Sequence, residues 1–283
     1  MATDGVRAFA PAKINLALHV TGQRPDGYHT IDSLVAFADV GDLIACRPAG
    51  KLTLNIGGSM CYGVTKGRDN LVLRAARLLD PNGAAVIDLV KELPVASGIG
   101  GGSADAAATL RALSELWHLP LPPPAAILTL GADLPVCMLG KPARMQGIGD
   151  IVTPLAAPLP QTWLVLANPG ETLATRAVFD QLRDHEYPPM PEVLPAFATV
   201  KDLVLFMLDQ RNDLEFPAME LVPEIAEVLF LLQQRPGCLM ARMSGSGATC
   251  FGIFGNRDDA EHAAQSLRRQ RGHWWVEPGQ LLA

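Results

Sequence analysis

Residues 94–108 read PVASGIGGGSADAAA, and four of the five positions from Gly98 to Gly102 are glycine. The preceding residues 84–93 (AAVIDLVKEL) predict a strand, and residues 103–117 predict a helix because their apolar side chains recur on one helical face. Glycine lets a ligand approach the backbone closely, and the unpaired N–H groups at a helix start attract an anion. The stretch therefore predicts a phosphate-binding loop between a strand and a helix.

Two familiar glycine motifs fit this stretch poorly. A Walker loop needs Lys-Ser or Lys-Thr after its glycines, and none follows here. A dinucleotide fingerprint is matched by Gly98 and Gly100, but Ser103 stands at the third glycine position. Glu115, the acidic residue nearest the place that this fingerprint requires, falls inside the predicted helix rather than at the end of a second strand. Taken alone, the stretch could also be a tight structural turn.

The composition bounds the class of protein. The chain has 283 residues, of which 49% are hydrophobic and 18% charged, so it can form a sizeable core in one large or two ordinary domains. Its net charge of −6 argues against a nucleic-acid-binding protein, which needs a basic face. No apolar run approaches the roughly 18 residues of a membrane span, and the N-terminus has no signal-like apolar region. We therefore expect a cytoplasmic protein that binds no membrane.

The five cysteines are widely spaced, and no CxxC pair is present. This spacing suggests neither a zinc site nor a disulfide framework. Buried, inert thiols in a reducing compartment are the expectation.

Residues 13–20 (KINLALHV) alternate between apolar and polar side chains and predict a strand. Lys13 and Asn15 share one face of this strand near its start. A solvated outer face is the ordinary interpretation of such a pair. Pro11 immediately before the strand restricts the backbone and favours a positioned lysine instead.

A turn-rich loop follows this strand, and its Pro-Asp-Gly sequence at 25–27 is a strong turn signal. Tyr28 and His29 come directly after the turn. One interpretation is a loop with a half-buried tyrosine. The other is a platform on which an aromatic ring stacks against a nucleobase while polar groups read the edge of the base.

Asp133 lies among small and apolar residues in the sequence GADLP at 131–135. A lone aspartate in such a turn is usually a helix cap or part of an Asx-turn. Beyond it, residues 154–160 are rich in proline and predict a linker, so we expect a domain boundary between residues 155 and 156. The second half predicts strands at 162–167, 238–243, 248–254 and 273–276, and helices at 174–183, 200–208, 220–234 and 258–269. Together these elements predict an α+β domain with an antiparallel sheet.

Three separated motifs follow one another along the chain. The first is residues 11–15 (PAKIN) with 26–29 (DGYH), and the second is the glycine loop at 94–108. The third is residues 243–248 (MSGSGA), which taken alone predict a hairpin turn. From about residue 10 to about residue 254, the chain resembles the superfamily of galactokinase, homoserine kinase, mevalonate kinase and phosphomevalonate kinase (GHMP kinases). The resemblance implies a two-domain α+β fold. Its N-terminal domain would resemble ribosomal protein S5 domain 2, and its C-terminal domain would be ferredoxin-like.

The resemblance also implies roles for individual residues. The catalytic lysine and aspartate correspond to Lys13 and Asp133, and the substrate-binding residues to Asn15, Tyr28, His29 and Phe179. The ATP phosphate loop corresponds to Pro94, Val95, Ala96, Ser97, Gly98, Ile99, Gly100, Gly101, Gly102, Ser103 and Ala104. The usual motif has leucine and serine where Ile99 and Ala104 stand, so a hydroxyl that could contact phosphate or magnesium is missing. No metal ligand is assigned.

The segment 24–29 (RPDGYH) resembles the members of this superfamily whose acceptor is a cytidine diphosphate-linked methylerythritol of non-mevalonate isoprenoid synthesis. The resemblance therefore implies transfer of the γ-phosphate of ATP, with Mg²⁺, to a hydroxyl of that small molecule, by a monomer or weak homodimer. A carboxylate such as Asp133 would accept the hydroxyl proton, and Lys13 would offset the developing charge. A homoserine, mevalonate or sugar kinase remains the alternative, although those acceptors carry no base to stack. A nicotinamide oxidoreductase and a non-catalytic nucleotide-binding regulator fit less well, and no Gly-x-Ser-x-Gly elbow supports a serine hydrolase.

Overall fold

The structure is a computed structural model that describes residues 5–184 and 186–282 of the chain. Its contacts divide it into two compact units. Unit 1 comprises the chain up to Ala12, Gly41–Val95 and Gly100–Gly140, and unit 2 comprises Lys13–Val40, Ala96–Ile99 and the chain from Lys141. The long strands β1 (Val6–Gln23) and β2 (His29–Pro48) contribute residues to both units. These units are groups of residues in contact, and they do not test the expected domain boundary between residues 155 and 156, which stays a prediction.

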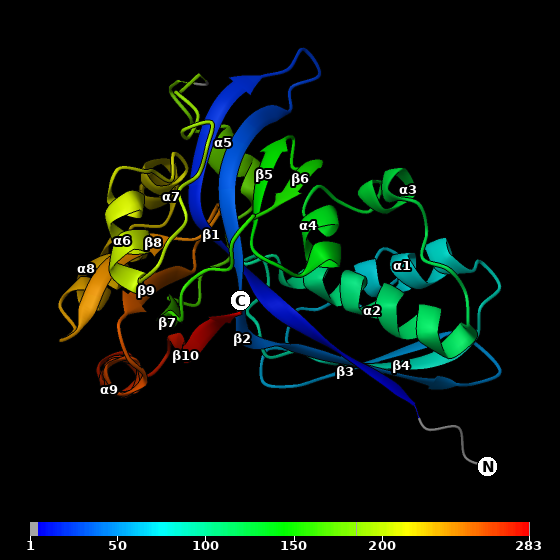
Figure 1. The fold of residues 1–283 in the computed structure, drawn as a ribbon. Helices are drawn as coiled ribbons and strands as arrows, with labels where there is room; N and C mark the ends of the chain where they lie inside the picture. Colours follow the sequence, from blue (N-terminus) through cyan, green and yellow to red (C-terminus); the bar gives the residue numbers. More distant parts are fainter. Residues whose placement is uncertain (1–4, 185, 283) are drawn as a thin grey trace. The chain divides into compact units, whose positions relative to one another are not determined.

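Unit 1 combines a small sheet with four helices (Figure 1). β3 (Thr53–Gly57) runs parallel to β4 (Ala85–Val90), and β4 pairs antiparallel with the second half of β2. The helices are α1 (Leu71–Leu79), α2 (Gly101–Trp117), α3 (Pro124–Leu128) and α4 (Leu134–Leu139). α2 packs against α1 and α4 through apolar side chains, including Ala75, Ala106, Leu110 and Leu134. The predicted strand, loop and helix around the glycines are confirmed, and α2 begins two residues earlier than expected.

Unit 2 is built on antiparallel strands. β10 (Trp275–Leu282), β7 (Trp163–Asn168), β9 (Cys250–Phe254) and β8 (Cys238–Met243) pair in that order, and every pairing is antiparallel. β5 (Ala143–Gly147) pairs with the first half of β2 and with β6 (Ile151–Pro154). The helices are α5 (Thr175–Phe179), α6 (Val200–Leu208), α7 (Glu215–Leu221), α8 (Glu224–Gln233) and α9 (Arg257–Gln270). The predicted antiparallel α+β organisation is confirmed.

Several element boundaries differ from the expectation. The helix predicted over 220–234 is two helices, because α7 ends at Leu221 and α8 begins only after Pro223, whose ring and missing N–H interrupt a helix. The helix predicted over 174–183 is restricted to the five residues of α5. α4 was not predicted, and Pro135 lies in its first turn, where proline is tolerated. The last strand extends beyond the predicted 273–276 to Leu282.

The middle of β1 is buried on both faces. Lys13 is only 4% exposed and Asn15 only 1%, so the ordinary interpretation of a solvated outer face is wrong for this pair, and the burial agrees with the positioned lysine that Pro11 favours. Alternation along a strand separates two faces but does not tell which face a second layer covers. The buried lysine therefore needs polar or anionic neighbours, since an isolated buried charge is strongly disfavoured.

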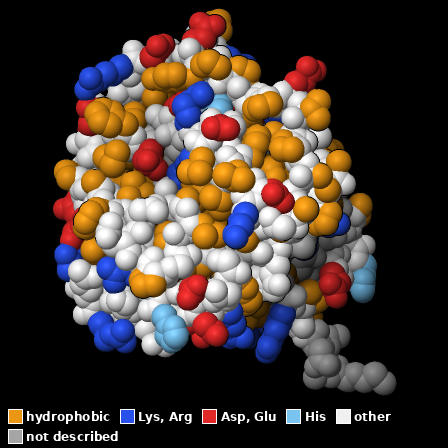
Figure 2. Space-filling view, turned by 60° about the vertical axis from the view of Figure 1, so that its left-hand side comes forward, with side chains coloured by type: hydrophobic (Ala, Val, Ile, Leu, Met, Phe, Trp, Pro, Cys, Tyr) orange, Lys and Arg blue, Asp and Glu red, His pale blue; other side chains and the backbone are white. Residues whose placement is uncertain are grey.

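The remaining expectations concern thiols and surfaces. None of the five cysteines, all of which the structure describes, forms a disulfide, and burial raises the pKa of Cys46 to about 12 and that of Cys238 to about 11, which makes both thiols poor nucleophiles. No helix among the described residues is long and apolar enough to cross a membrane. Leu205, Leu208 and Phe230 are exposed on α6 and α8, but charged groups interrupt the hydrophobic side chains on the face that Figure 2 shows. This surface by itself indicates no partner.

Candidate active site

The first part of the glycine loop is held in unit 2 through its carbonyl groups. Residues 96–99 accept one hydrogen bond each, at N···O or O···O distances between 2.9 and 3.2 Å. The donors are Leu173 N–H to Ala96, Thr249 N–H to Ser97, the Ser244 hydroxyl to Gly98 and Lys13 N–H to Ile99. Each of these carbonyl oxygens is therefore paired with a donor of the protein. A loop that presents its N–H groups to an anion needs its carbonyl oxygens to be paired elsewhere.

Gly98 allows this loop to lie against a second glycine turn, at residues 244–247. Gly98 has a φ of +77°, and a Cβ placed on it would lie 2.4 Å from the Ser244 carbonyl oxygen and 2.5 Å from Gly247 N. Gly245 has a φ of +56°, and its Cβ would lie 2.7 Å from the Gly98 carbonyl oxygen. No side chain fits at either position, so the two glycine turns meet backbone to backbone. This contact explains why the third sequence motif accompanies the second.

The other part of the loop belongs to unit 1. Gly100 precedes α2 in a left-handed conformation, with φ of 65°, and Gly101 is the first residue of the helix. The turn that carries Asp133 approaches the same helix, because a Cβ on Gly131 would lie 4.0 Å from Ser103 Oγ. Within unit 1, the beginning of α2 and the segment containing Asp133 are therefore neighbours.

Asp133 occupies the cap position of α4, but its side chain makes no capping hydrogen bond. A side-chain cap, one of the two ordinary interpretations of this residue, is therefore not found. Lys13 belongs to unit 2, and its pairing with Asp133 stays a prediction.

Asn15 is positioned precisely by its neighbours within unit 2. Its backbone N–H donates to Ser244 Oγ at 3.1 Å, and its side-chain Nδ2 donates to Ser33 Oγ at 2.8 Å. Ser33 Oγ in turn donates to the Ala17 carbonyl at 2.6 Å, which orients the amide. Asn15 Oδ1 is left as a buried acceptor with no hydrogen-bond partner, and a Cβ on Gly245 would lie 3.0 Å from it. Because such an atom is costly to leave unpaired, it is suited to accept a bond from a ligand hydroxyl.

Two of the predicted substrate-binding residues lie in contact although they are far apart in the sequence. The rings of His29 and Phe179 stack with centroids 4.8 Å apart and an interplanar angle of 18°. Tyr28 beside them is 62% exposed, and its N–H donates to Asp26 Oδ1 at 3.2 Å. The half-buried tyrosine of the alternative interpretation is therefore not found. The Asx-turn instead leaves the ring of Tyr28 exposed, at the position directly before His29.

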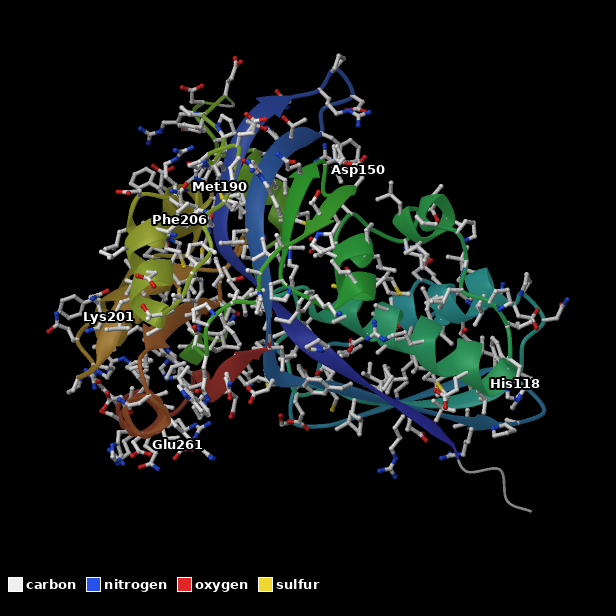
Figure 3. All side chains as sticks on the ribbon, in the orientation of Figure 1. His118, Asp150, Met190, Lys201, Phe206 and Glu261 are labelled. Carbon is white, nitrogen blue, oxygen red and sulfur yellow. The ribbon has the colours of Figure 1, made fainter. Side chains whose placement is uncertain are left out.

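Sequence reasoning missed the ion pair that anchors the segment following α5. Arg144 forms a two-pronged ion pair with Asp32, whose distances are 2.7 and 2.6 Å, and Asp32 Oδ2 also accepts the N–H of Met190 at 2.9 Å. Hydrogen bonding to Asp32 raises the pKa of Arg144. Met190 lies on the connection between α5 and α6 in Figure 3. No local sequence signal could reveal this contact, since Asp32 and Arg144 face each other only because β2 and β5 pair.

His19 anchors the same segment from β1. Its Nδ1 lies 3.0 Å from the Pro188 carbonyl oxygen, and its Nε2 lies 3.1 Å from Arg211 N, which is the donor. Nδ1 must therefore carry the proton and donate to Pro188. Burial, together with Arg211, lowers the pKa of His19, which keeps the ring neutral in this role. His19 is thus a structural residue rather than a candidate acid or base.

The family can now be determined. The models for the N-terminal and C-terminal domains of GHMP kinases match residues 70–155 and 193–273. A 4-diphosphocytidyl-2-C-methyl-D-erythritol kinase of Cereibacter sphaeroides is 58% identical over 275 residues, which cover 97% of this chain and 99% of the relative. The chain belongs to the 4-diphosphocytidyl-2-C-methyl-D-erythritol kinase family. Membership of this kinase family makes the protein a phosphotransferase.

Solved structures agree with this family. A crystal structure of 4-(cytidine 5'-diphospho)-2C-methyl-D-erythritol kinase matches with a TM-score of 0.79 and 34% identity, over 98% of this chain and 99% of that one. A second match is the crystal structure of L. major mevalonate kinase in complex with R-mevalonate, with a TM-score of 0.70 and 15% identity over 100% of this chain and 99% of that one. At that identity only the fold is shared. The GHMP kinase fold expected from the motifs is confirmed.

Proposed function

We propose that this chain transfers the γ-phosphate of ATP to the 2-hydroxyl of 4-diphosphocytidyl-2-C-methyl-D-erythritol, giving the 2-phosphate and ADP in non-mevalonate isoprenoid synthesis. The observation that carries the proposal is the 58% identity, over nearly the whole chain, to a relative named for this kinase activity. The stacked rings of His29 and Phe179, with Tyr28 exposed beside them, support a pyrimidine subsite. Aromatic faces bind nucleobases by stacking, and a histidine can hydrogen-bond to the edge of a base.

ATP is the phosphoryl donor in this proposal, and residues 94–104 are its phosphate loop. The engaged carbonyls of residues 96–99 and the start of α2 at Gly101 support that assignment. Helix N-termini bind phosphate through N–H groups and the helix dipole. Phosphoryl transfer depends mainly on positioning and charge stabilisation, so an acidic protein can bind ATP without a large basic patch.

Mg²⁺ is expected to accompany ATP. Within residues 5–184 and 186–282, no cluster of three His, Cys, Asp or Glu side chains could hold a metal ion, so no protein ligand is assigned. In kinases, Mg²⁺ is usually bound through one or two carboxylates together with substrate phosphates and water. When bound, the ion would offset negative charge on the β- and γ-phosphates.

The protein's own groups would act on the acceptor. Asp133 accepts the proton of the 2-hydroxyl as that oxygen attacks phosphorus. Lys13 offsets the negative charge that develops during transfer, and burial strengthens this effect by excluding water. Asn15 Oδ1, the buried acceptor, hydrogen-bonds to an acceptor hydroxyl and so orients the substrate.

The first test is release of ADP from ATP and Mg²⁺ by the purified protein, with four candidate acceptors in parallel. We expect turnover with 4-diphosphocytidyl-2-C-methyl-D-erythritol and none with homoserine, mevalonate or galactose. Turnover with one of the other three would retain the kinase and replace the proposed acceptor. No nucleotide turnover with any of them, together with no ATP binding, would contradict the proposal. The cytoplasmic location and the monomer or weak homodimer are parts of the proposal that fractionation and light scattering would test.

Tyr28→Ala is expected to raise KM for the cytidine substrate about 10- to 100-fold, because stacking contributes about 1–3 kcal/mol per base. KM for ATP should change less than about twofold, since the phosphate loop is made by other residues. Phe179→Ala should give the same selective loss. Steady-state kinetics with each substrate varied in turn would measure both constants.

Tyr62→Ala is the matched control, because Tyr62 is 96% exposed and lies in unit 1. It should leave both KM values unchanged. If Tyr28→Ala raised KM for ATP as much as KM for the cytidine substrate, the stacking assignment would be wrong.

A further inference from the structure

Three buried charged residues form a cluster in unit 1 that the proposed chemistry does not use. Lys91 contacts the carboxylate of Asp42 and lies 3.0 Å from Asp105 Oδ2. All three side chains are at most 4% exposed. Such a cluster is expensive to bury, and breaking it by removing one partner leaves an uncompensated charge. Because this costly cluster lies beside the glycine loop, we expect it to affect the geometry of that loop.

The cluster contacts the backbone on both sides of the phosphate loop. On the upstream side, Asp42 Oδ1 accepts the N–H groups of Glu92 and Leu93, at 2.6 and 2.8 Å, and Pro94 follows immediately. On the downstream side, Asp105 is the fifth residue of α2. Lys91 bridges the two carboxylates and so joins the strand end to the helix start. The loop between these flanks runs from residue 94 to residue 100.

The glycine sequence itself accommodates this cluster. A Cβ on Gly101 would lie 3.0 Å from Lys91 Nζ, closer than ordinary contact. A side chain there would push the ammonium away from its carboxylates or shift the start of α2. Gly101 therefore leaves room for the buried lysine, as well as for any ligand that approaches the loop.

We propose that Lys91, Asp42 and Asp105 are positioning residues that hold the two flanks of the phosphate loop in the geometry that binds ATP. This inference rests on the proposed function, because it assumes that residues 94–104 bind ATP phosphates. None of the three needs to touch the nucleotide. They act through the backbone of residues 92–94 and through the first turns of α2.

The ionisation of Asp105 gives the cluster a charge that changes with pH, and this change can be measured. Burial raises the pKa of Asp105 to about 7, Asp42 adds to the rise, and Lys91 opposes it. Asp105 Oδ1 is buried without a hydrogen-bond partner, so no donor stabilises the charged form at this oxygen. Two charged groups face Asp105: Asp42 on β2, and Lys91, the residue that follows β4. The other elements packed against α2, which are α1 and α4, contact it through apolar side chains. Ionisation above pH 7 therefore leaves this cluster with a net negative charge behind the start of α2.

The sign of the pH effect follows from the raised pKa. Below pH 7 the protonated Asp105 leaves Lys91 and Asp42 as a neutral pair, and above pH 7 the added negative charge disfavours an anion at the helix start. KM for ATP should therefore rise with pH through about 7. In Asp105→Asn, which keeps an oxygen for Lys91 but cannot ionise, this rise should be absent. The ratio of the two KM values removes the titration of ATP itself, since both proteins bind the same nucleotide.

The experiment measures ATP affinity and steady-state constants for the wild type, Asp105→Asn and Asp105→Ala from pH 6 to 9. At pH 6, where Asp105 is protonated in the wild type, we expect Asp105→Ala to raise KM for ATP about tenfold, the equivalent of about 1.4 kcal/mol, with KM for the acceptor unchanged. Asp105→Asn should restore the wild-type value at pH 6. Asp88→Asn is the control, because Asp88 forms an exposed pair with Arg47 on the same sheet.

Equal KM values for ATP in the wild type and in a folded Asp105→Ala would overturn the inference while leaving the proposed kinase intact. The inference would also be overturned if KM for ATP in Asp105→Asn kept the wild-type pH dependence. This second comparison tests the inference even if Asp105→Ala does not fold. If the wild type did not bind ATP at all, the proposed function and this inference would both fail.

Discussion

Asp133→Asn is expected to lower kcat about a thousandfold while both substrates still bind. The amide has the size of the carboxylate but cannot accept the proton of the attacking hydroxyl, and general base catalysis contributes about 10²- to 10⁴-fold to a rate. Because Asp133 does not cap α4 through its side chain, the exchange removes no capping hydrogen bond and should not unfold the helix. Rapid-quench measurement of a single turnover would report the chemical step directly.

The control for this variant is Asp258→Asn, at an exposed position in the first turn of α9. It should keep wild-type kcat. The affinities for ATP and for the cytidine substrate, measured by calorimetry on Asp133→Asn, should stay within about threefold of the wild type, a difference of less than about 1 kcal/mol. Loss of both affinities together with activity would show that Asp133 is a structural turn residue instead of a base.

Local sequence patterns were sufficient for many of the helices and strands, whereas the two-domain fold was expected from the family resemblance. α2 was predictable because the apolar spacing of residues 103–117 and the glycines that precede them agree. The break between α7 and α8 was missed, because the apolar periodicity of residues 220–234 outweighed the signal of Pro223. Burial of Lys13 could not be read from alternation, since a strand covered on both faces and a half-exposed strand can show the same pattern.

Some features of the candidate site could likewise be predicted from the local sequence, and others could not. The glycine turns could be predicted because close backbone contact restricts residue type within a few positions, as at Gly98. The His29–Phe179 stack joins residues from separate elements, and no local pattern indicates which aromatic ring meets which. Phe179 was therefore assigned through family resemblance alone. The Lys91–Asp42 contact was missed for a related reason, because the pairing of β2 with β4 brings it about.

Lys13→Met is expected to lower kcat about 100- to 1,000-fold, the range found when one preorganised donor to a developing charge is removed. Methionine keeps the length and apolar stem of lysine, so packing around a side chain that is only 4% exposed should be preserved. The backbone bond from Lys13 N–H to the Ile99 carbonyl, at 2.9 Å, does not depend on the side chain. The loop residues 96–99 should therefore keep their conformation, and KM for ATP should change less than about threefold, which is under about 1 kcal/mol.

This prediction separates a catalytic lysine from a lysine that only binds nucleotide. A cation that contacts ATP equally in the ground state and the transition state would raise KM without changing kcat, because uniform binding does not accelerate chemistry. A cation needed only as charge develops would lower kcat and leave KM unchanged. Lys201→Met, at an exposed position on α6 that Figure 3 labels, controls for loss of a positive charge within the same unit. Unchanged kcat with a large rise in KM for ATP would therefore move Lys13 from catalysis to nucleotide binding, and Asp133 would have to act without it.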